Sequence, residues 1–160
     1  MPTLPIHQVI PQLLTALAHG TRAVLSAPPG AGKTTIVPLA LLDQAWVSGR
    51  IILVEPRRLA ARAAAGRMAQ LRGDAIGDSV GYRMRLDTRI SARTRIEVVT
   101  EGVFTRMVLD DPELEGISVV LFDEFHERSL DADFGLALAL DVQSGLREDL
   151  RIVVMSATLD

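Results

Sequence analysis

The segment that most constrains the fold is Ala-Pro-Pro-Gly-Ala-Gly-Lys-Thr at residues 27–34. An apolar stretch at 23–27 precedes it and predicts a short strand, and residues 33–45 predict a helix. A glycine-rich turn between a strand and a helix directs consecutive backbone N–H groups toward the start of the helix, where an anion binds. The segment therefore predicts a strand–loop–helix unit that holds phosphate.

The lysine of this segment supports the same interpretation. Lys33 is the single lysine among 17 basic residues, and codon bias toward arginine explains the arginines but not the position of this lysine. Lysine is a compact point charge, whereas arginine is a planar fork for which a backbone cradle has less room. We expect Lys33 to reach the β- and γ-phosphates and the Thr34 hydroxyl to bind Mg²⁺. The expected nucleotide-binding residues of the loop are Pro29, Gly30, Ala31, Gly32, Lys33, Thr34 and Thr35.

The loop departs from the usual phosphate-binding pattern at one position, because Ala27 stands where glycine is typical. The strand before the loop and the helix after it compensate for this departure. The alternative interpretation is a glycine-rich turn that binds no ligand.

Strands and helices alternate along the chain, which is typical of an α/β sandwich with a parallel sheet. Residues 51–54 and 119–122 are almost wholly apolar, as expected of strands buried on both faces. We predict one α/β domain over 1–160, with a mostly parallel sheet flanked by helices on both faces and a helix within 1–20 packed on it. The expected helices are 6–18, 33–45, 57–72, 101–109 and 130–144, and the expected strands are 23–27, 51–54, 79–85, 95–99, 119–122 and 151–155.

The composition argues against several classes of protein. The chain has no cysteine, which excludes a disulfide framework, and its three histidines are too scattered to predict a zinc site by spacing. No apolar run approaches the length of a membrane span, and the first residues lack the charged region of a secretory signal. We therefore expect a cytoplasmic protein without a membrane span.

A second motif follows the apolar stretch 119–122, where Asp123 and Glu124 stand side by side. The carboxyl ends of parallel strands form the edge at which ligands bind, so both acids are expected at the mouth of the sheet. We expect Asp123 to hold Mg²⁺, with Glu124 beside the metal, orienting and polarising the attacking water. An acidic turn after a strand is the alternative, but the phosphate loop upstream favours the metal site.

His126 and two hydroxyl residues complete the candidate site. A histidine three residues after Asp123 can stay near the γ-phosphate and transmit its presence, although a lone histidine is often structural. Ser156 and Thr158 follow the last expected strand, and we expect their hydroxyls to bond the acids and His126 if the two strands are neighbours.

Charge is distributed unevenly along the chain, although the net charge is only −3. Residues 57–95 hold ten arginines against three acids, a balance of +7, and residues 101–160 hold four arginines against fourteen acids, a balance of −10. A basic stretch is the electrostatic mark of a polyanion partner, and a solvated arginine-rich surface is the alternative.

The set and order of these motifs resemble the first RecA-like domain of a superfamily 2 helicase of the DEAH/RHA type, and most of all the bacterial HrpB-type ATP-dependent helicases. The resemblance covers nearly all of the chain and implies a RecA-like P-loop NTPase fold. The similar segments are 27–34 (motif I), 55–61 (motif Ia), 80–87 (the Gly-Tyr-x-x-Arg segment), 99–102 (motif Ib), 123–126 (motif II, with Phe125 where most relatives carry alanine) and 156–160 (motif III).

The resemblance implies roles for further residues. Arg57 and Arg58 would contact the nucleic-acid backbone. Thr100, Glu101 and Gly102 would offer a helix start to a phosphate, and the expected N-cap at Thr100 supports this independently. Arg67 matches an arginine that stacks on the nucleotide base in DEAH relatives, with an exposed helix residue as the alternative.

The resemblance also implies partners and activity. The expected cofactors are ATP and Mg²⁺, and the expected partner is RNA or another single-stranded nucleic acid. A second RecA-like domain, normally in the same polypeptide, supplies the arginine fingers and half of the nucleic-acid track in this family, and it is absent from this chain. We therefore expect weak binding, little hydrolysis and no unwinding by the chain alone. A different P-loop NTPase and a non-catalytic binding module remain alternatives, and RNA or DNA, polarity and oligomeric state stay open.

Overall fold

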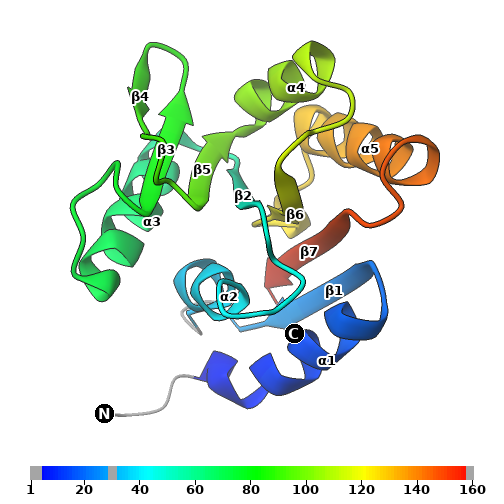
Figure 1. Cartoon of the computed structure of the whole chain (residues 1–160), viewed down its shortest axis with the longest axis horizontal. Coiled ribbons are helices and arrows are strands. Elements are labelled where there is room, and N and C mark those ends of the chain that lie inside the picture. The colour runs from blue at the N-terminus through cyan, green and yellow to red at the C-terminus, as the bar shows by residue number, and fades with distance from the viewer. Residues whose placement is uncertain (1–4, 29–31, 158–160) are drawn as a thin grey trace.

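The structure, a computed structural model, describes residues 5–28 and 32–157, which form one seven-stranded sheet in the order β1-β7-β6-β2-β5-β3-β4 (Figure 1). Neighbouring strands in this part of the chain are parallel, except for the antiparallel pair β3 and β4. This confirms the predicted mostly parallel sheet. The strands are β1 (Arg22–Ala27), β2 (Arg50–Glu55), β3 (Val80–Met84), β4 (Asp87–Arg89), β5 (Ile96–Thr100), β6 (Ile117–Phe122) and β7 (Arg151–Ala157).

Helices cover both faces of the sheet, as predicted (Figure 1). Side chains alternate between the faces, so Ile51 and Leu53 of β2 pack with α1, α2 and α3, whereas Ile52 and Val54 pack with α4 and α5. No helix in the described residues is long and apolar enough to cross a membrane. The helices are η1 (Pro5–Gln8), α1 (Ile10–His19), α2 (Lys33–Leu41), α3 (Arg58–Arg72), α4 (Glu101–Asp110), η2 (Phe125–Glu127) and α5 (Leu130–Gly145).

The N-terminal helix differs from the prediction at its start. A 3-10 turn, η1, comes first, and α1 begins only at Ile10 because Pro11 suits the first turn of a helix but not its interior. The predicted apolar face is confirmed: Ile6, Leu13 and Leu17 are buried in the core.

Helix α2 is shorter than the predicted 33–45 and ends at Leu41. Pro38 lies inside it and removes one backbone donor from the helical ladder. The chain then tightens, with the Leu42 N–H donating to the Leu39 carbonyl at 3.3 Å. The loss of regular helix after Pro38 explains the early end.

The expected strand 79–85 is in fact the first arm of a hairpin. β3 ends at Met84 and β4 returns antiparallel to it from Asp87. The turn contains Leu86, with a φ of 66° and a side chain that is 97% exposed. Leucine carries no turn signal and rarely adopts this conformation, so sequence pattern alone missed the reversal.

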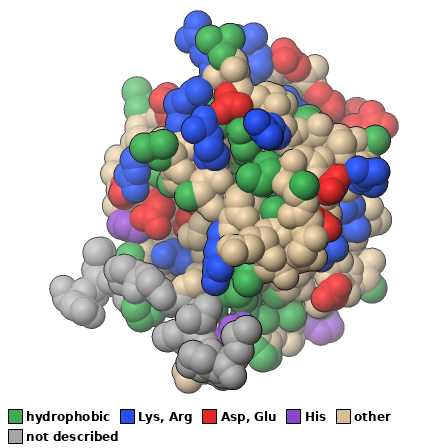
Figure 2. Space-filling model, turned by 90° about the vertical axis from the view of Figure 1, so that its left-hand side faces the viewer, with side chains coloured by type: hydrophobic (Ala, Val, Ile, Leu, Met, Phe, Trp, Pro, Cys, Tyr) green, Lys and Arg blue, Asp and Glu red, His purple; other side chains and the backbone are tan. Residues whose placement is uncertain are grey.

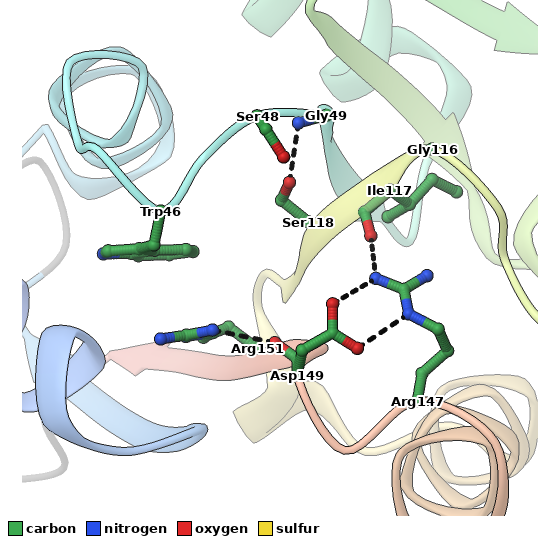
Figure 3. Close-up of a pocket in the computed structure, with 9 residues that line it drawn as sticks. All are labelled: Trp46, Ser48, Gly49, Gly116, Ile117, Ser118, Arg147, Asp149 and Arg151. Atoms are coloured by element: carbon green, nitrogen blue, oxygen red, sulfur yellow. Dashed lines mark hydrogen bonds and ion pairs between the residues drawn. The ribbon is translucent and has the colours of Figure 1, made fainter.

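A polar cavity of about 160 Å³ lies at the edge of the sheet where β2, β6 and β7 begin (Figure 3). The chain passes very close to itself there, since a Cβ on Gly49 would stand 2.4 Å from the Gly116 carbonyl oxygen. The Gly49 N–H donates to the Ser118 hydroxyl at 2.8 Å, and the Arg151 guanidinium lies 4.5 Å from the centre of the Trp46 ring. These groups pair with one another, so we assign the cavity a structural role.

Arg147 is expected to stabilise this edge of the sheet. Its guanidinium donates to the Leu114 and Ile117 carbonyls, both at 2.8 Å, and to both oxygens of Asp149 (Figure 3). Arg147→Ala should lower the free energy of unfolding by roughly 2–3 kcal/mol, because it leaves buried carbonyls without donors. Urea denaturation checks this against Arg106→Ala, which changes an exposed arginine of α4. Equal stabilities of the two variants would contradict the assigned role.

Candidate nucleotide-binding site

The predicted functional residues meet at the carboxyl edge of the parallel strands. The phosphate loop follows β1, Asp123 follows β6, and Ala157 ends β7. Glu55 and Thr100 end the neighbouring strands β2 and β5, where they are register partners. The sheet therefore gathers segments that lie far apart in the sequence along one edge, as predicted.

The helix start after the phosphate loop is built as the sequence predicted. Gly32 has a φ of 92°, a left-handed conformation that glycine adopts without steric cost, and α2 begins at Lys33. The Lys33 side chain is buried, and its Nζ lies 3.8 Å from Glu124 Oε1. Pro29, Gly30 and Ala31 lie outside the described residues. The described part thus presents a buried ammonium group and a helix N-terminus to the same space.

Thr34 and Asp123 are in direct contact. The Thr34 hydroxyl donates to Asp123 Oδ2 at 2.7 Å. Asp123 is only 5% exposed, and its other oxygen, Oδ1, is buried without a hydrogen-bond partner among the described residues. A hydroxyl and a carboxylate with a free oxygen are hard oxygen donors that fit Mg²⁺. The structure thus brings together two of the residues that sequence analysis assigned to the metal.

Glu124 has a strained backbone and two charged neighbours. Its φ is 56°, in the left-handed region, and it precedes the short helix η2. Its Oε2 lies 3.4 Å from His126 Nε2, and its Oε1 faces Lys33. Non-glycine residues in this conformation are costly and gather at functional sites. The strain directs the carboxylate back toward the phosphate loop.

His126 connects this segment to β7, but not through the predicted donors. The backbone N–H of Ala157 donates to His126 Nδ1 at 2.9 Å. Because Nδ1 accepts this bond, a neutral His126 carries its proton on Nε2, which faces Glu124. The expected donors were the hydroxyls of Ser156 and Thr158. The prediction is wrong in the donor, and Thr158 lies outside the described residues. Adjacent strands align backbone groups with the histidine, which residue types do not reveal.

An open cleft of about 370 Å³ runs between the start of α2 and the helix α3. Thr34, Thr35, Asp123 and Glu124 line one side of it, and Arg67 lies on the other. The predicted base-stacking arginine therefore faces the same space as the phosphate-binding threonines. The floor between them is formed by the small side chains of Ala60, Ala63 and Ala64.

Glu55 also lines this cleft and was missed by sequence analysis. It is 1% exposed and lies beside Asp123 because β2 and β6 are neighbours in register. Burial, followed by the proximity of Asp123 and Glu124, raises the pKa of Glu55 to about 10. A signal was present in the sequence, since Glu55 directly follows an apolar strand just as Asp123 does.

The predicted nucleic-acid residues flank the cleft on the same sheet edge. Arg57 forms an exposed ion pair with both oxygens of Glu127, at 2.9 and 2.8 Å, and Arg58 donates to the Arg85 carbonyl at 2.9 Å. Figure 2 shows Lys and Arg side chains gathered on the upper part of the face that carries α3 and the β3–β4 hairpin. Many of these arginines are paired: Arg62 with Asp87, Arg72 with Asp74, and Arg93 with Asp78.

The helix start at motif Ib is confirmed in position and corrected in detail. Thr100 is the N-cap of α4, and Gly102 lies in the first turn, exposed. The Thr100 side chain makes no capping hydrogen bond, so its N-terminal N–H groups are not satisfied by this hydroxyl. Glu101 instead accepts a hydrogen bond from the Ser129 hydroxyl at 3.1 Å, and burial raises the pKa of Glu101.

Comparison with known proteins agrees with this arrangement. The chain matches the DEAD/DEAH box helicase family over residues 6–160. It is 58% identical over 160 residues to the "ATP-dependent RNA helicase HrpB" of Escherichia coli (strain K12), covering 100% of this chain and 20% of that protein. It is 38% identical over 162 residues to the "DExH-box ATP-dependent RNA helicase DExH1" of Arabidopsis thaliana, covering 98% of this chain and 16% of that protein.

A solved structure shares the fold over the whole chain. The crystal structure of the E. coli DExH-box NTPase HrpB superposes with a TM-score of 0.97 at 58% identity, covering 100% of this chain and 20% of that chain. This confirms the RecA-like fold. The chain spans about a fifth of the length of these relatives. On this similarity of sequence and fold, the chain belongs to the DEAD/DEAH box helicase family.

Proposed function

We propose that this chain is the ATP-binding half of a nucleic-acid-dependent ATPase of the helicase type. The observation that carries the proposal is the convergence of Lys33, Thr34, Asp123 and Glu124 on one cleft at the carboxyl edge of the sheet. The relatives are named ATP-dependent RNA helicases, so ATP is the proposed nucleotide and RNA the proposed nucleic acid. ATP and RNA are intracellular molecules, and we propose a cytoplasmic location for the protein.

Each residue of the cleft has a distinct proposed task. The N-terminus of α2 and Lys33 bind the phosphates, while Thr34 and Asp123 hold Mg²⁺. Mg²⁺ supplies positive charge that offsets the charge developing on the phosphate oxygens. Glu124 accepts a hydrogen bond from the attacking water and orients it. Arg67 covers the base from α3.

His126 is proposed to report the state of the cleft to β7. It contacts Glu124 on one side and the Ala157 backbone on the other, so a movement of Glu124 shifts the end of the strand. Ser156 and Thr158 belong to the same proposed coupling segment. The segment lies between the nucleotide cleft and whatever follows β7 in a longer polypeptide.

We further propose that a second RecA-like domain completes the ATPase site. The arginines that line the described cleft, Arg57 and Arg67, both belong to this domain, and Arg57 is paired with Glu127. An arginine finger from a facing domain is worth ~10³–10⁵ in rate in comparable phosphoryl-transfer systems.

The 160-residue chain alone is therefore expected to hydrolyse ATP at a small fraction of the rate of a two-domain form. Steady-state ATPase of both forms, with and without RNA or DNA, measures this. A turnover on the order of 10 s⁻¹ by the single chain, which is typical of complete enzymes, would refute the two-domain proposal. Nucleotide binding without turnover in either form would favour the second candidate, a non-catalytic binding module.

Arg57 and Arg58 are expected to bind the backbone of a single strand. The exposed Arg57–Glu127 pair is worth at most about 1 kcal/mol, so a phosphate can displace the carboxylate. Changing both arginines to alanine should weaken binding to all sequences alike. The slope of log K against log salt should flatten by one to two units of roughly 0.7 each.

The matched control is the double variant Arg72→Ala with Arg93→Ala. It removes the same charge from the same basic stretch, but those arginines are paired with Asp74 and Asp78. Fluorescence anisotropy with single-stranded RNA and DNA over a salt series measures both variants. Equal slopes for the two double variants would show that the basic stretch acts only as a solvated surface.

A further inference from the structure

Three acids are buried among the described residues, and they differ in what faces them. Glu55, Glu97 and Asp123 are 1%, 1% and 5% exposed. Glu97 has two arginines as counter-charges, since it forms ion pairs with Arg50 and, at 3.6 Å, with Arg83. A buried carboxylate of this kind is stable because its charge is offset inside the protein.

Glu55 has no such counter-charge within the described residues. The groups that act on it most strongly are the carboxyls of Asp123 and Glu124. The basic group nearest in effect is Arg57, whose guanidinium is already held by both oxygens of Glu127. Glu55 Oε2 and Asp123 Oδ1 are both buried without hydrogen-bond partners in the part of the chain that the structure describes. Oxygens of two adjacent acids are therefore left for a positively charged ligand or for water bound to one.

The position of Glu55 is also fixed firmly. It ends β2, a strand paired on both sides, with β5 and with β6. It lines the same cleft as Thr34 and Asp123, the residues proposed to hold the metal. A rigid strand end with a free carboxyl oxygen toward a metal site is the usual form of an outer support for metal ligands.

We propose that Glu55 is a positioning residue of the magnesium site, where its carboxylate accepts hydrogen bonds from the metal's water shell beside Thr34 and Asp123. Mg²⁺ keeps several of its waters when bound to protein, so it needs acceptors beyond its direct ligands. The proposal rests on the proposed nucleotide function of the cleft. It adds a third acid, from motif Ia, to the hydroxyl of motif I and the acids of motif II.

The test measures how Mg²⁺ changes nucleotide affinity in the 160-residue chain. ADP binding is titrated by calorimetry in EDTA and again in excess Mg²⁺, and Mn²⁺ binding to the ADP complex is followed by electron paramagnetic resonance. Glu55→Gln keeps the size of the side chain and removes its charge. We expect metal-free ADP affinity to stay within about threefold of wild type, and Mn²⁺ affinity to fall about 10- to 100-fold.

Glu97→Gln is the matched control, because Glu97 is the same residue type with the same burial on a neighbouring strand. It should leave the Mn²⁺ affinity of the ADP complex unchanged. Glu55→Asp keeps the charge on a shorter stem and should recover part of the metal affinity that Glu55→Gln loses. It also carries the test if Glu55→Gln fails to fold by circular dichroism, since a wild-type or intermediate Mn²⁺ affinity is then expected.

The outcomes separate the two proposals. Wild-type chain that binds ADP more tightly with Mg²⁺, with the same gain in Glu55→Gln, would overturn the role of Glu55 and leave the nucleotide site intact. Equal losses in Glu55→Gln and Glu55→Asp would also overturn it, because the charge would then not matter. Wild-type chain that binds no ADP under either condition would overturn the nucleotide function itself, and the role of Glu55 with it.

Discussion

Glu124→Gln in a two-domain form is expected to lower ATP turnover by about 10²- to 10⁴-fold while Mg-ATP affinity stays near wild type. The variant keeps the size of the side chain and loses the carboxylate that polarises water. In the structure this carboxylate lies between Lys33 and His126, and it is not the acid that bonds Thr34. Its loss should therefore affect the chemical step more than binding.

Single-turnover kinetics together with a binding titration tests this expectation. Single-turnover rates isolate the chemical step from product release. Glu148→Gln is the control, because Glu148 is an exposed acid in the turn before β7, at the opposite edge of the sheet. If hydrolysis and affinity fall together in Glu124→Gln, Glu124 is a binding or structural residue rather than the group that acts on water.

Lys33→Ala is expected to weaken nucleotide binding by about 10- to 150-fold, or ~1.5–3 kcal/mol, because it removes a charge-assisted contact to phosphate. Lys33 is 4% exposed, so it is held in the site rather than free in solvent. The variant also removes the partner of Glu124 at 3.8 Å, and the remaining carboxylate then repels the phosphates.

A fluorescent ADP analogue titrated into wild type and variant measures the loss. Lys33→Arg is an informative companion, because it keeps the charge but places a planar fork where little space is left. We expect it to bind nucleotide more weakly than wild type. Wild-type affinity in Lys33→Ala would refute the assignment of the phosphate loop.

Much of the site was predictable because its signals are local. The strands at 51–54 and 119–122 were expected from runs of apolar residues, and the structure has them at the centre of the sheet. Polar residues that directly follow such strands must lie at the sheet edge, and this rule placed Asp123 and Glu124 correctly. Gly32 was expected in the phosphate loop, and its left-handed backbone at the start of α2 meets that expectation.

Other features were not predictable, since they depend on neighbours remote in the sequence. The hydrogen bond to His126 comes from the Ala157 backbone, and every residue type has that donor. Arg57 is held by Glu127, 70 residues away, and no pattern in the basic stretch announces this pair. The reversal at Leu86 lacks a turn residue and is sustained by the pairing of β3 with β4.

The sequence by itself therefore determined the alternation of strands and helices, the phosphate loop and the acids of motif II, because apolar period and strand ends are properties of short segments. The order of the strands was decided only in the tertiary structure. That order places β2 beside β6 and so brings Glu55 against Asp123, leaving two buried acids side by side. Their charges become coupled only when the sheet forms, because water separates and screens them in the unfolded chain.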